Sequence, residues 1–181
     1  RVRTIISADF DNDGYDEIFL NNIGQSNRLF KVKENGLLEK IVLKDAALSN
    51  GFGTGAAVAD VDDDGILELL ISNGERLKQP LNLFKANINS NSSYLRVKPL
   101  TEYNAPARGA TVTLISNLRT HAKTIDAGSG YLCQMEPVAH FGIRDNENEF
   151  KIIIKWTDGT SYSFETKKLN REITIKKNNY F

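Results

Sequence analysis

The chain has 181 residues, of which 40% are hydrophobic, and its 23 Lys and Arg residues balance its 23 Asp and Glu residues. This composition is typical of a globular protein with one or two domains. The zero net charge and the scattered basic residues argue against nucleic-acid binding, and no apolar run approaches the ~18 residues that a membrane-spanning helix requires.

An acidic loop lies near the start of the chain, between two short apolar segments. Residues 9–17 read DFDNDGYDE and contain five carboxylates in nine positions. A sharp turn at Gly14 would let several carboxylates point at one centre, and clustered carboxylate oxygens are the ligands that calcium prefers. For this loop alone, the alternative is an Asp/Asn/Gly turn without a metal. The candidate ligands are Asp9, Asp11, Asp13 and Glu17.

A second copy of the loop, DVDDDGILE at residues 60–68, follows 51 residues (60 minus 9) after the first. Its Asp60, Asp62, Asp64, Gly65 and Glu68 fall at the offsets of the first copy. An EF-hand is excluded, because it needs flanking helices and a Glu at loop position twelve, where the two copies have Leu20 and Ile71. The short apolar flanks instead predict a strand, loop, strand unit in each copy.

Further strands are predicted between and after the loops, at residues 28–32, 38–43 and 81–85. The sequences Leu-Phe-Lys at 29–31 and 83–85 extend the repeat beyond the acidic loop. A period of about 50 residues suits a four-stranded propeller blade. Residues 1–88 are therefore predicted to form two blade-like repeats of a partial β-propeller.

The polar residues 89–93 are predicted to link these repeats to a second β domain at residues 94–181. The linker contains the sequon Asn91-Ser92-Ser93, a candidate N-glycosylation site. Beyond it, alternating segments at 94–100, 110–115, 150–156 and 173–175 predict strands, and Asp158-Gly159 predicts a hairpin turn. We expect a small β-sandwich or barrel.

No catalytic site is predicted. Asp126, Ser129, His140 and Asp158 are residue types found in hydrolases, but Ser129 lies in Gly-Ser-Gly, outside the Gly-x-Ser-x-Gly motif. The glycines around Ser129 favour a tight turn over a ligand-binding loop. The single cysteine, Cys133, has two interpretations: a small buried residue, or a disulfide to a region outside this chain.

Several motifs together resemble a known family. Residues 51–60 (GFGTGAAVAD) and the acidic loop after them resemble the FG-GAP or VCBS repeat, which builds calcium-stabilised β-propellers. Residues 128–142 and the Trp156–Gly159 segment resemble the ASPIC/UnbV domain. In this order, the two resemble the C-terminal half of the cartilage acidic protein family, a group of secreted glycoproteins.

This resemblance implies structural Ca²⁺ in both loops. The implied ligands are Asp9, Asp11, Asp13, Glu17 and the Tyr15 carbonyl in the first loop, and Asp60, Asp62, Asp64, Glu68 and the Ile66 carbonyl in the second. Both loops depart from the family by offering Glu at the ninth position, where Asp is usual. Two repeats cannot close a propeller ring, so further blades are expected upstream.

The functional hypothesis is a non-catalytic, secreted, extracellular module for cell adhesion or matrix interaction. Its partner would be a protein at the cell surface or in the extracellular matrix. The alternative is an accessory domain that positions a larger enzyme or cell-surface complex.

Overall fold

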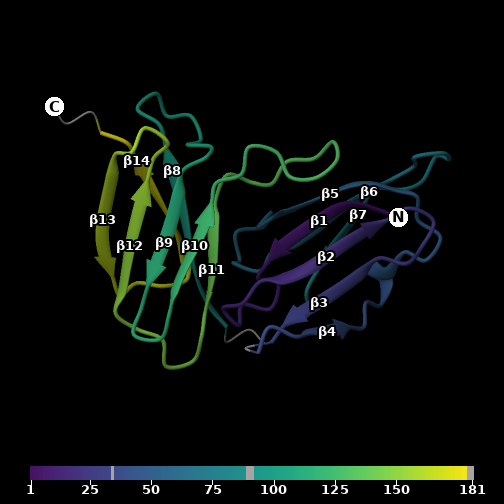
Figure 1. Ribbon diagram of the computed structural model, residues 1–181, viewed down its shortest axis with the longest axis horizontal. Helices are drawn as coiled ribbons and strands as arrows, with labels where there is room; N and C mark the ends of the chain where they lie inside the picture. Colours follow the sequence, from purple (N-terminus) through teal and green to yellow (C-terminus); the bar gives the residue numbers. More distant parts are fainter. Residues whose placement is uncertain (34, 89–91, 179–181) are drawn as a thin grey trace. The chain divides into compact units, whose positions relative to one another are not determined.

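A computed structural model describes residues 1–33, 35–88 and 92–178 (Figure 1). Within these residues the chain consists of β-strands and one short 3-10 helix, Asp45–Ala47, which confirms the predicted all-β class. The chain divides into two compact units. Among the described residues, the first unit contains 1–11, 15–88 and 128–136, and the second contains 12–14, 92–127 and 137–178.

The first unit contains two successive antiparallel meanders, each with the connectivity of a propeller blade (Figure 1). The first sheet has the order β1-β2-β3-β4 and the second the order β5-β6-β7. The strands are β1 (Val2–Ala8), β2 (Glu17–Asn22), β3 (Arg28–Val32), β4 (Leu38–Ile41), β5 (Gly53–Ala59), β6 (Glu68–Asn73) and β7 (Asn82–Lys85).

The 51-residue period is kept in the pairing of the strands. Ala8 pairs with Glu17 at the loop end of the first hairpin, and Ala59 pairs with Glu68 in the second. At the far end, the register shifts once in each hairpin, between Val2 and Thr4 and between Gly53 and Gly55. The two sheets are therefore structural repeats as well as sequence repeats.

The acidic loops share a backbone conformation. Gly14 and Gly65 have φ angles of 89° and 82°, and Asn12 and Asp63 have φ angles of 56° and 60°. Positive φ is open to glycine and is tolerated by Asn and Asp. The predicted turn at Gly14 thus occurs in both copies.

Alternating side chains of the two blades form one apolar core. In β1, Ile6 is buried whereas Ile5 is 61% exposed, as period-2 alternation requires. The core residues are Ile6, Ala8, Phe10, Phe19, Ala56, Val58, Leu67, Leu69 and Ile71. This core fixes both hairpins, and through them the ends of the acidic loops.

The second unit contains two sheets around a second core. One sheet has the order β10-β9-β12-β13, and the other has the order β11-β8-β14, in which β8 and β14 run parallel. Since both sheets contribute buried residues to one cluster, including Val97 of β8 and Ile152 of β12, the unit is a β-sandwich. The strands are β8 (Ser93–Leu100), β9 (Thr111–Ile115), β10 (Thr120–Thr124), β11 (Ala139–Ile143), β12 (Phe150–Lys155), β13 (Ser161–Thr166) and β14 (Arg171–Lys176).

Strands β10 and β11 were not expected from the sequence. All five residues of β11 are buried, so its side chains show no alternation of polar and apolar residues.

The sequon residue Asn91 and most of the predicted linker lie outside the described residues. Among the described residues, no helix is long and apolar enough to cross a membrane.

Candidate metal centre

Three aspartates of the first acidic loop converge. One carboxylate oxygen from each of Asp9, Asp11 and Asp13 lies within 4.8 Å of the other two. Asp9 is 1% exposed, and the other two are half-buried. Like charges this close and this buried repel one another unless a cation lies among them, so the group could hold a metal ion.

The second acidic loop forms an equivalent group from a slightly different set. Here the oxygens of Asp60, Asp62 and Glu68 lie within 4.8 Å of one another. Asp60 Oδ2 also accepts a hydrogen bond from the backbone N–H of Gly65 at 3.0 Å, which ties the start of the loop to its glycine. This group could likewise hold a metal ion, and its donor set consists of the hard carboxylate oxygens that calcium prefers.

A buried glutamate closes each loop from β2 or β6. Glu17 is 1% exposed and Glu68 is 4% exposed. Glu17 Oε2 accepts from the backbone N–H of Phe10 at 2.9 Å, and Glu68 Oε2 accepts from the N–H of Val61 at 2.7 Å. One oxygen of each glutamate thus accepts a hydrogen bond from the loop backbone, and in the second loop the other oxygen, Glu68 Oε1, lies 2.8 Å from Lys85 Nζ.

In each loop, the structure thus brings together some of the predicted ligands but not all of them. The convergent groups lack Glu17 in the first loop and Asp64 in the second. Asp64 Oδ1 instead accepts from the N–H of Ile66 at 2.9 Å. The ligand assignments as a whole, including the carbonyls of Tyr15 and Ile66, remain predictions.

Two lysines that the sequence did not reveal contact these carboxylates. Lys31 Nζ in β3 lies 2.8 Å from Asp11 Oδ2. Lys85 Nζ in β7 lies 2.8 Å from oxygens of Asp62, Asp64 and Glu68. Partial burial of Lys85 disfavours its charge, but its hydrogen bonds to the three carboxylates outweigh this and hold its pKa above the ordinary value.

Lys85 in turn affects the pKa of one of its partners, Asp64. Burial alone would raise the pKa of Asp64, but hydrogen bonds from Lys85 and from the Ile66 N–H hold it below the ordinary value. A further carboxylate, Glu136, comes from the 128–136 segment of the same unit and accepts from the Asp60 N–H at 3.2 Å. The second loop is therefore surrounded by more acidic groups than its own sequence contains.

Two of the four residues considered for catalysis, His140 and Asp158, have side-chain contacts of other kinds in the structure. Burial, together with the charges of Lys123 and Arg96, lowers the pKa of His140 to about 3, and its ring stacks on Tyr94 at 6.0 Å between centroids. Asp158 accepts hydrogen bonds from Lys177 and Thr160, which lower its pKa to about 2.

The segment around Ser129 is a turn. Gly130 has a φ of 75°, which agrees with the interpretation of the glycines as turn residues. The half-buried Cys133 Sγ lies 2.5 Å from the Ser129 carbonyl oxygen and donates to it. The Ser129 carbonyl thus helps to hold the turn.

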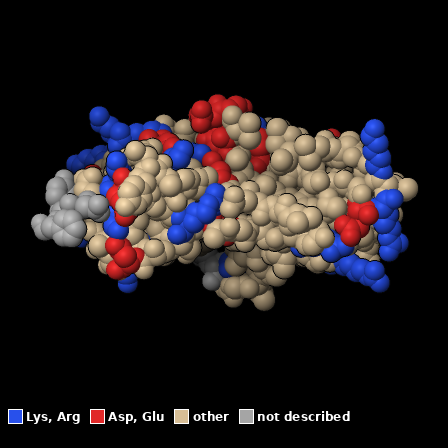
Figure 2. All heavy atoms as spheres, turned by 90° about the horizontal axis from the view of Figure 1, so that it is seen from above, with Lys and Arg blue, Asp and Glu red and all other residues tan. Residues whose placement is uncertain are grey.

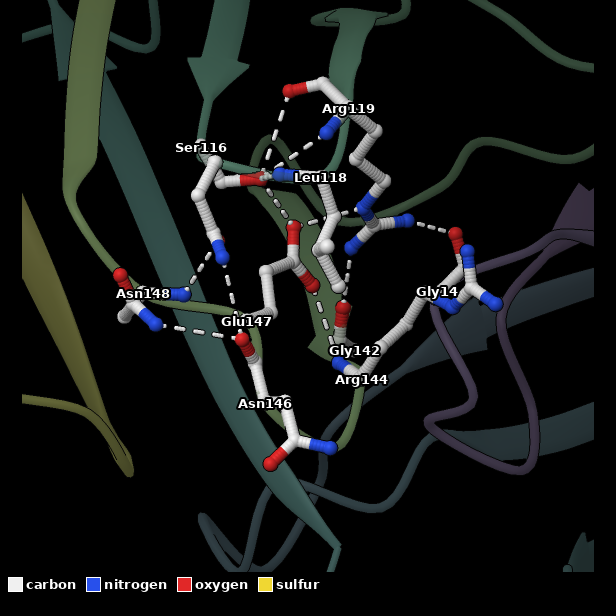
Figure 3. Close-up of polar contacts among 10 residues, drawn as sticks. Gly14, Ser116, Leu118, Arg119, Gly142, Arg144, Asn146, Glu147 and Asn148 are labelled. Carbon is white, nitrogen blue, oxygen red and sulfur yellow. Dashed lines mark hydrogen bonds and ion pairs between the residues drawn. The ribbon is translucent and has the colours of Figure 1, made fainter.

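The second unit contains a buried carboxylate of a different kind, Glu147 (Figure 3). Its side chain is fully buried and accepts from Arg119 Nε and Ser116 Oγ, each at 2.8 Å, and from the Arg144 N–H at 3.0 Å. Arg119 also donates to the carbonyl oxygen of Gly142 at 2.6 Å. These bonds fix the ends of strands β9, β10 and β11.

Charge is unevenly distributed on the face shown in Figure 2. Acidic side chains form one dense group and several smaller ones, and Lys and Arg side chains likewise occupy several separate places. On this face there is no single continuous basic surface of the kind that follows a nucleic-acid backbone.

Comparisons with known proteins agree with this architecture. The FG-GAP-like repeat family matches residues 9–71, a range that begins at Asp9 and includes both acidic loops, and the family described as ASPIC and UnbV matches residues 100–180. Cartilage acidic protein 1 of Homo sapiens is 47% identical over 171 residues, and that of Mus musculus is 44% identical over 185 residues. The chain is a homologue of cartilage acidic protein 1.

The similarity covers most of this chain but a small part of its relatives. The human alignment covers 90% of this chain and 26% of the relative, and the mouse alignment covers 96% and 28%. The relatives' names do not identify them as enzymes. Among solved structures, "The Bacillus anthracis TIE protein" matches 85% of this chain and 30% of that chain with a TM-score of 0.30 and 14% identity, which is too low to support an argument.

Proposed function

We propose that this chain is a non-catalytic, calcium-binding module of a secreted protein, in which calcium stabilises the hairpin loops of two propeller blades. The observation that carries the proposal is that one arrangement occurs twice. Several carboxylates converge at the loop end of the β1–β2 hairpin and again at the loop end of the β5–β6 hairpin, and both loops have the same positive-φ turn. A structural feature repeated at a fixed spacing is hard to explain as two unrelated acidic turns.

The residues that would hold the ion are the convergent carboxylates. They are Asp9, Asp11 and Asp13 in the first loop and Asp60, Asp62 and Glu68 in the second, with Glu17 and Asp64 beside them. A bound calcium ion supplies positive charge that cancels the repulsion among these carboxylates. The chain itself supplies the rigid ends of each loop, because Phe19 and Ile71 in the strands that follow are completely buried.

The extracellular and adhesive parts of the proposal rest on homology. The relatives are named for cartilage, which supports a role in the extracellular matrix or at a cell surface, with a protein partner there. In that setting an affinity of roughly 0.1–1 mM for calcium is sufficient, as in other extracellular modules. We further propose that the chain acts as a binding module and not as an enzyme.

Differential scanning calorimetry tests the calcium site. A ligand that binds only the folded state stabilises it by RT ln(1 + [L]/Kd), so 10 mM calcium should add about 1.4–2.7 kcal/mol per site over chelator. This corresponds to a rise of several degrees in the melting temperature. An unchanged melting temperature across millimolar calcium would refute structural calcium. Magnesium should give a smaller rise, since it demands stricter geometry.

The second loop offers a matched pair of substitutions. Asp62→Asn removes a carboxylate of the convergent group, whereas Asp63→Asn makes the same chemical change one residue away, outside that group. Asn also suits the positive φ of 60° at position 63, because Asn12 occupies the same place in the first loop. D62N should lose part of the calcium-dependent rise and D63N should keep it. Equal losses in both variants would mean that net charge, and not a site, attracts the ion.

A further inference from the structure

Each blade brings a lysine from its third strand to its own acidic loop. Lys31 ends a Leu-Phe-Lys sequence in β3, and Lys85 ends the same sequence in β7. Both ammonium groups lie 2.8 Å from the second aspartate of their loop, Asp11 or Asp62. The contact is therefore part of the repeat.

The strand register explains how the lysine reaches the loop. In the second blade, Lys85 pairs directly with Glu68, the residue that closes the acidic loop. In the first blade, Ile18 pairs with Phe30, which places Lys31 one position further, next to Glu17. An antiparallel pair of this kind holds the two side chains on one face of the sheet at close range.

The lysines do not follow the 51-residue period, and this makes the repeated contact more informative. Asp11 and Lys31 are 20 residues apart, whereas Asp62 and Lys85 are 23 residues apart. The turn between the second and third strands differs in length by three residues, yet the lysine arrives at the same aspartate. Strand pairing, and not simple duplication of spacing, positions the ammonium group.

The ammonium group and a metal ion would need the same oxygens. Lys85 contacts Asp62 and Glu68, which are two of the three members of the convergent group, as well as Asp64. A calcium ion binds oxygens at about 2.3–2.6 Å. A second cation within ~4 Å of it would be strongly repelled in this partly buried place.

We propose that Lys31 and Lys85 are built-in counter-ions that compete with the metal for the acidic loops. This inference rests on the proposed calcium function. When calcium is scarce, the ammonium group neutralises the carboxylates and holds the loop in shape. When calcium binds, the lysine leaves, because its long flexible side chain can turn toward solvent without movement of the strand.

The competition lowers the apparent affinity for the metal. A ligand that binds only the lysine-out conformation has its apparent affinity reduced by the fraction of molecules in that conformation. If about one molecule in ten has the lysine out, calcium binds about tenfold more weakly than the carboxylates alone would allow. The lysines thus set the calcium concentration at which the loops change their counter-ion.

Replacement of the lysine by an uncharged side chain of similar length tests this competition. Lys85→Met should bind calcium about tenfold more tightly at one site by isothermal titration calorimetry. Lys85→Arg keeps the positive charge and should not gain affinity. Lys33→Met is the control for loss of a lysine as such, since Lys33 pairs with the exposed Glu39 and should leave calcium affinity unchanged.

Melting temperatures give a second, independent signature. Without calcium, K85M should melt below the original protein, because three carboxylates lose their counter-ion. With saturating calcium, the two should melt at the same temperature, so the calcium-dependent rise is larger in K85M. A purely structural lysine would lower both melting temperatures and leave affinity unchanged, which would overturn the inference.

The outcomes separate this inference from the proposed function. If the original protein responds to calcium and K85M responds with the same affinity, the competition is wrong and the calcium site stands. If only K85M and the double variant K31M/K85M bind calcium at millimolar concentration, the competition is supported. If neither the original protein nor any variant binds calcium, both proposals are overturned.

Discussion

Two buried glutamates, Glu68 in the first unit and Glu147 in the second, show two ways to keep a carboxylate inside a β protein. Their side chains are 5% and 0% exposed. Each accepts a backbone N–H, from Val61 and Arg144 respectively. They differ in the cation that neutralises them.

The cation beside Glu147 is fixed, and the cation beside Glu68 is not. Arg119 is 11% exposed and donates both to Glu147 and to the Gly142 carbonyl, so its planar guanidinium has one geometry (Figure 3). Lys85 is 30% exposed and ends in a compact ammonium group on a flexible chain. The arginine pair is suited to a permanent structural role, whereas the lysine pair can be exchanged for another cation.

The largest expected effect is at the fixed pair. Glu147→Ala leaves Arg119 buried without its counter-charge and should destabilise the second unit by about 3–5 kcal/mol. Urea denaturation measures this loss. Glu147→Gln, which keeps an acceptor for Ser116, should lose less. An equal loss in both variants would show that the charge of Glu147 does not stabilise the unit.

The matching change at the exchangeable pair should depend on calcium. Glu68→Gln keeps an oxygen for the Val61 N–H but removes a charge from the convergent group. In chelator its stability should be close to that of the original protein. In 10 mM calcium it should lack about 1.4–2.7 kcal/mol of stabilisation. Urea denaturation under both conditions gives the difference, and a similar loss in chelator would show that Glu68 is structural.

A smaller effect is expected from pH in the second unit. Burial and the charges of Lys123 and Arg96 lower the pKa of His140 to about 3 in the folded state. The unfolded chain, with an ordinary pKa near 6.5, therefore binds more protons between these values, and stability falls as pH falls. The loss should be about 1 kcal/mol between pH 6.5 and 5.5. Stability curves of His140→Gln should be flatter in this range; equal slopes would mean that another group titrates.

The sequence predicted the turn of each carboxylate loop because the information for it is local. The offsets of Asp and Gly within nine residues determine the turn, which occurs at Gly14 and Gly65 as expected. The ligand set of each loop stays a prediction, and the convergent groups lack Glu17 and Asp64. Residues 28–32 were predicted as a strand and coincide with β3. In these cases the local sequence was enough to predict the local structure.

The sequence did not reveal the partners that come from a distance. Lys85 reaches Glu68 through strand register, and Glu136 reaches Asp60 from 76 residues away. Register depends on the length of the connecting turn, which differs between the two blades. The buried Asn27, which accepts from the Asn22 N–H at 2.9 Å, was likewise not recognised as part of a network. Such contacts depend on tertiary structure, which residue spacing alone does not encode.

The smallest effect is expected at an exposed pair that resembles Lys85 and Glu68 in chemistry but not in burial. Lys33 Nζ lies 2.8 Å from Glu39 Oε2, with side chains 50% and 58% exposed. Hydrogen bonding and charge from Lys33 lower the pKa of Glu39. However, solvent screens such pairs and the side chains lose conformational freedom in forming them, so most contribute little. Glu39→Gln should therefore melt within error of the original protein in both calcium and chelator. A measurable calcium-dependent change in this variant would show that charge near the blade acts at long range, and the exchange of cations would then not be confined to the acidic loops.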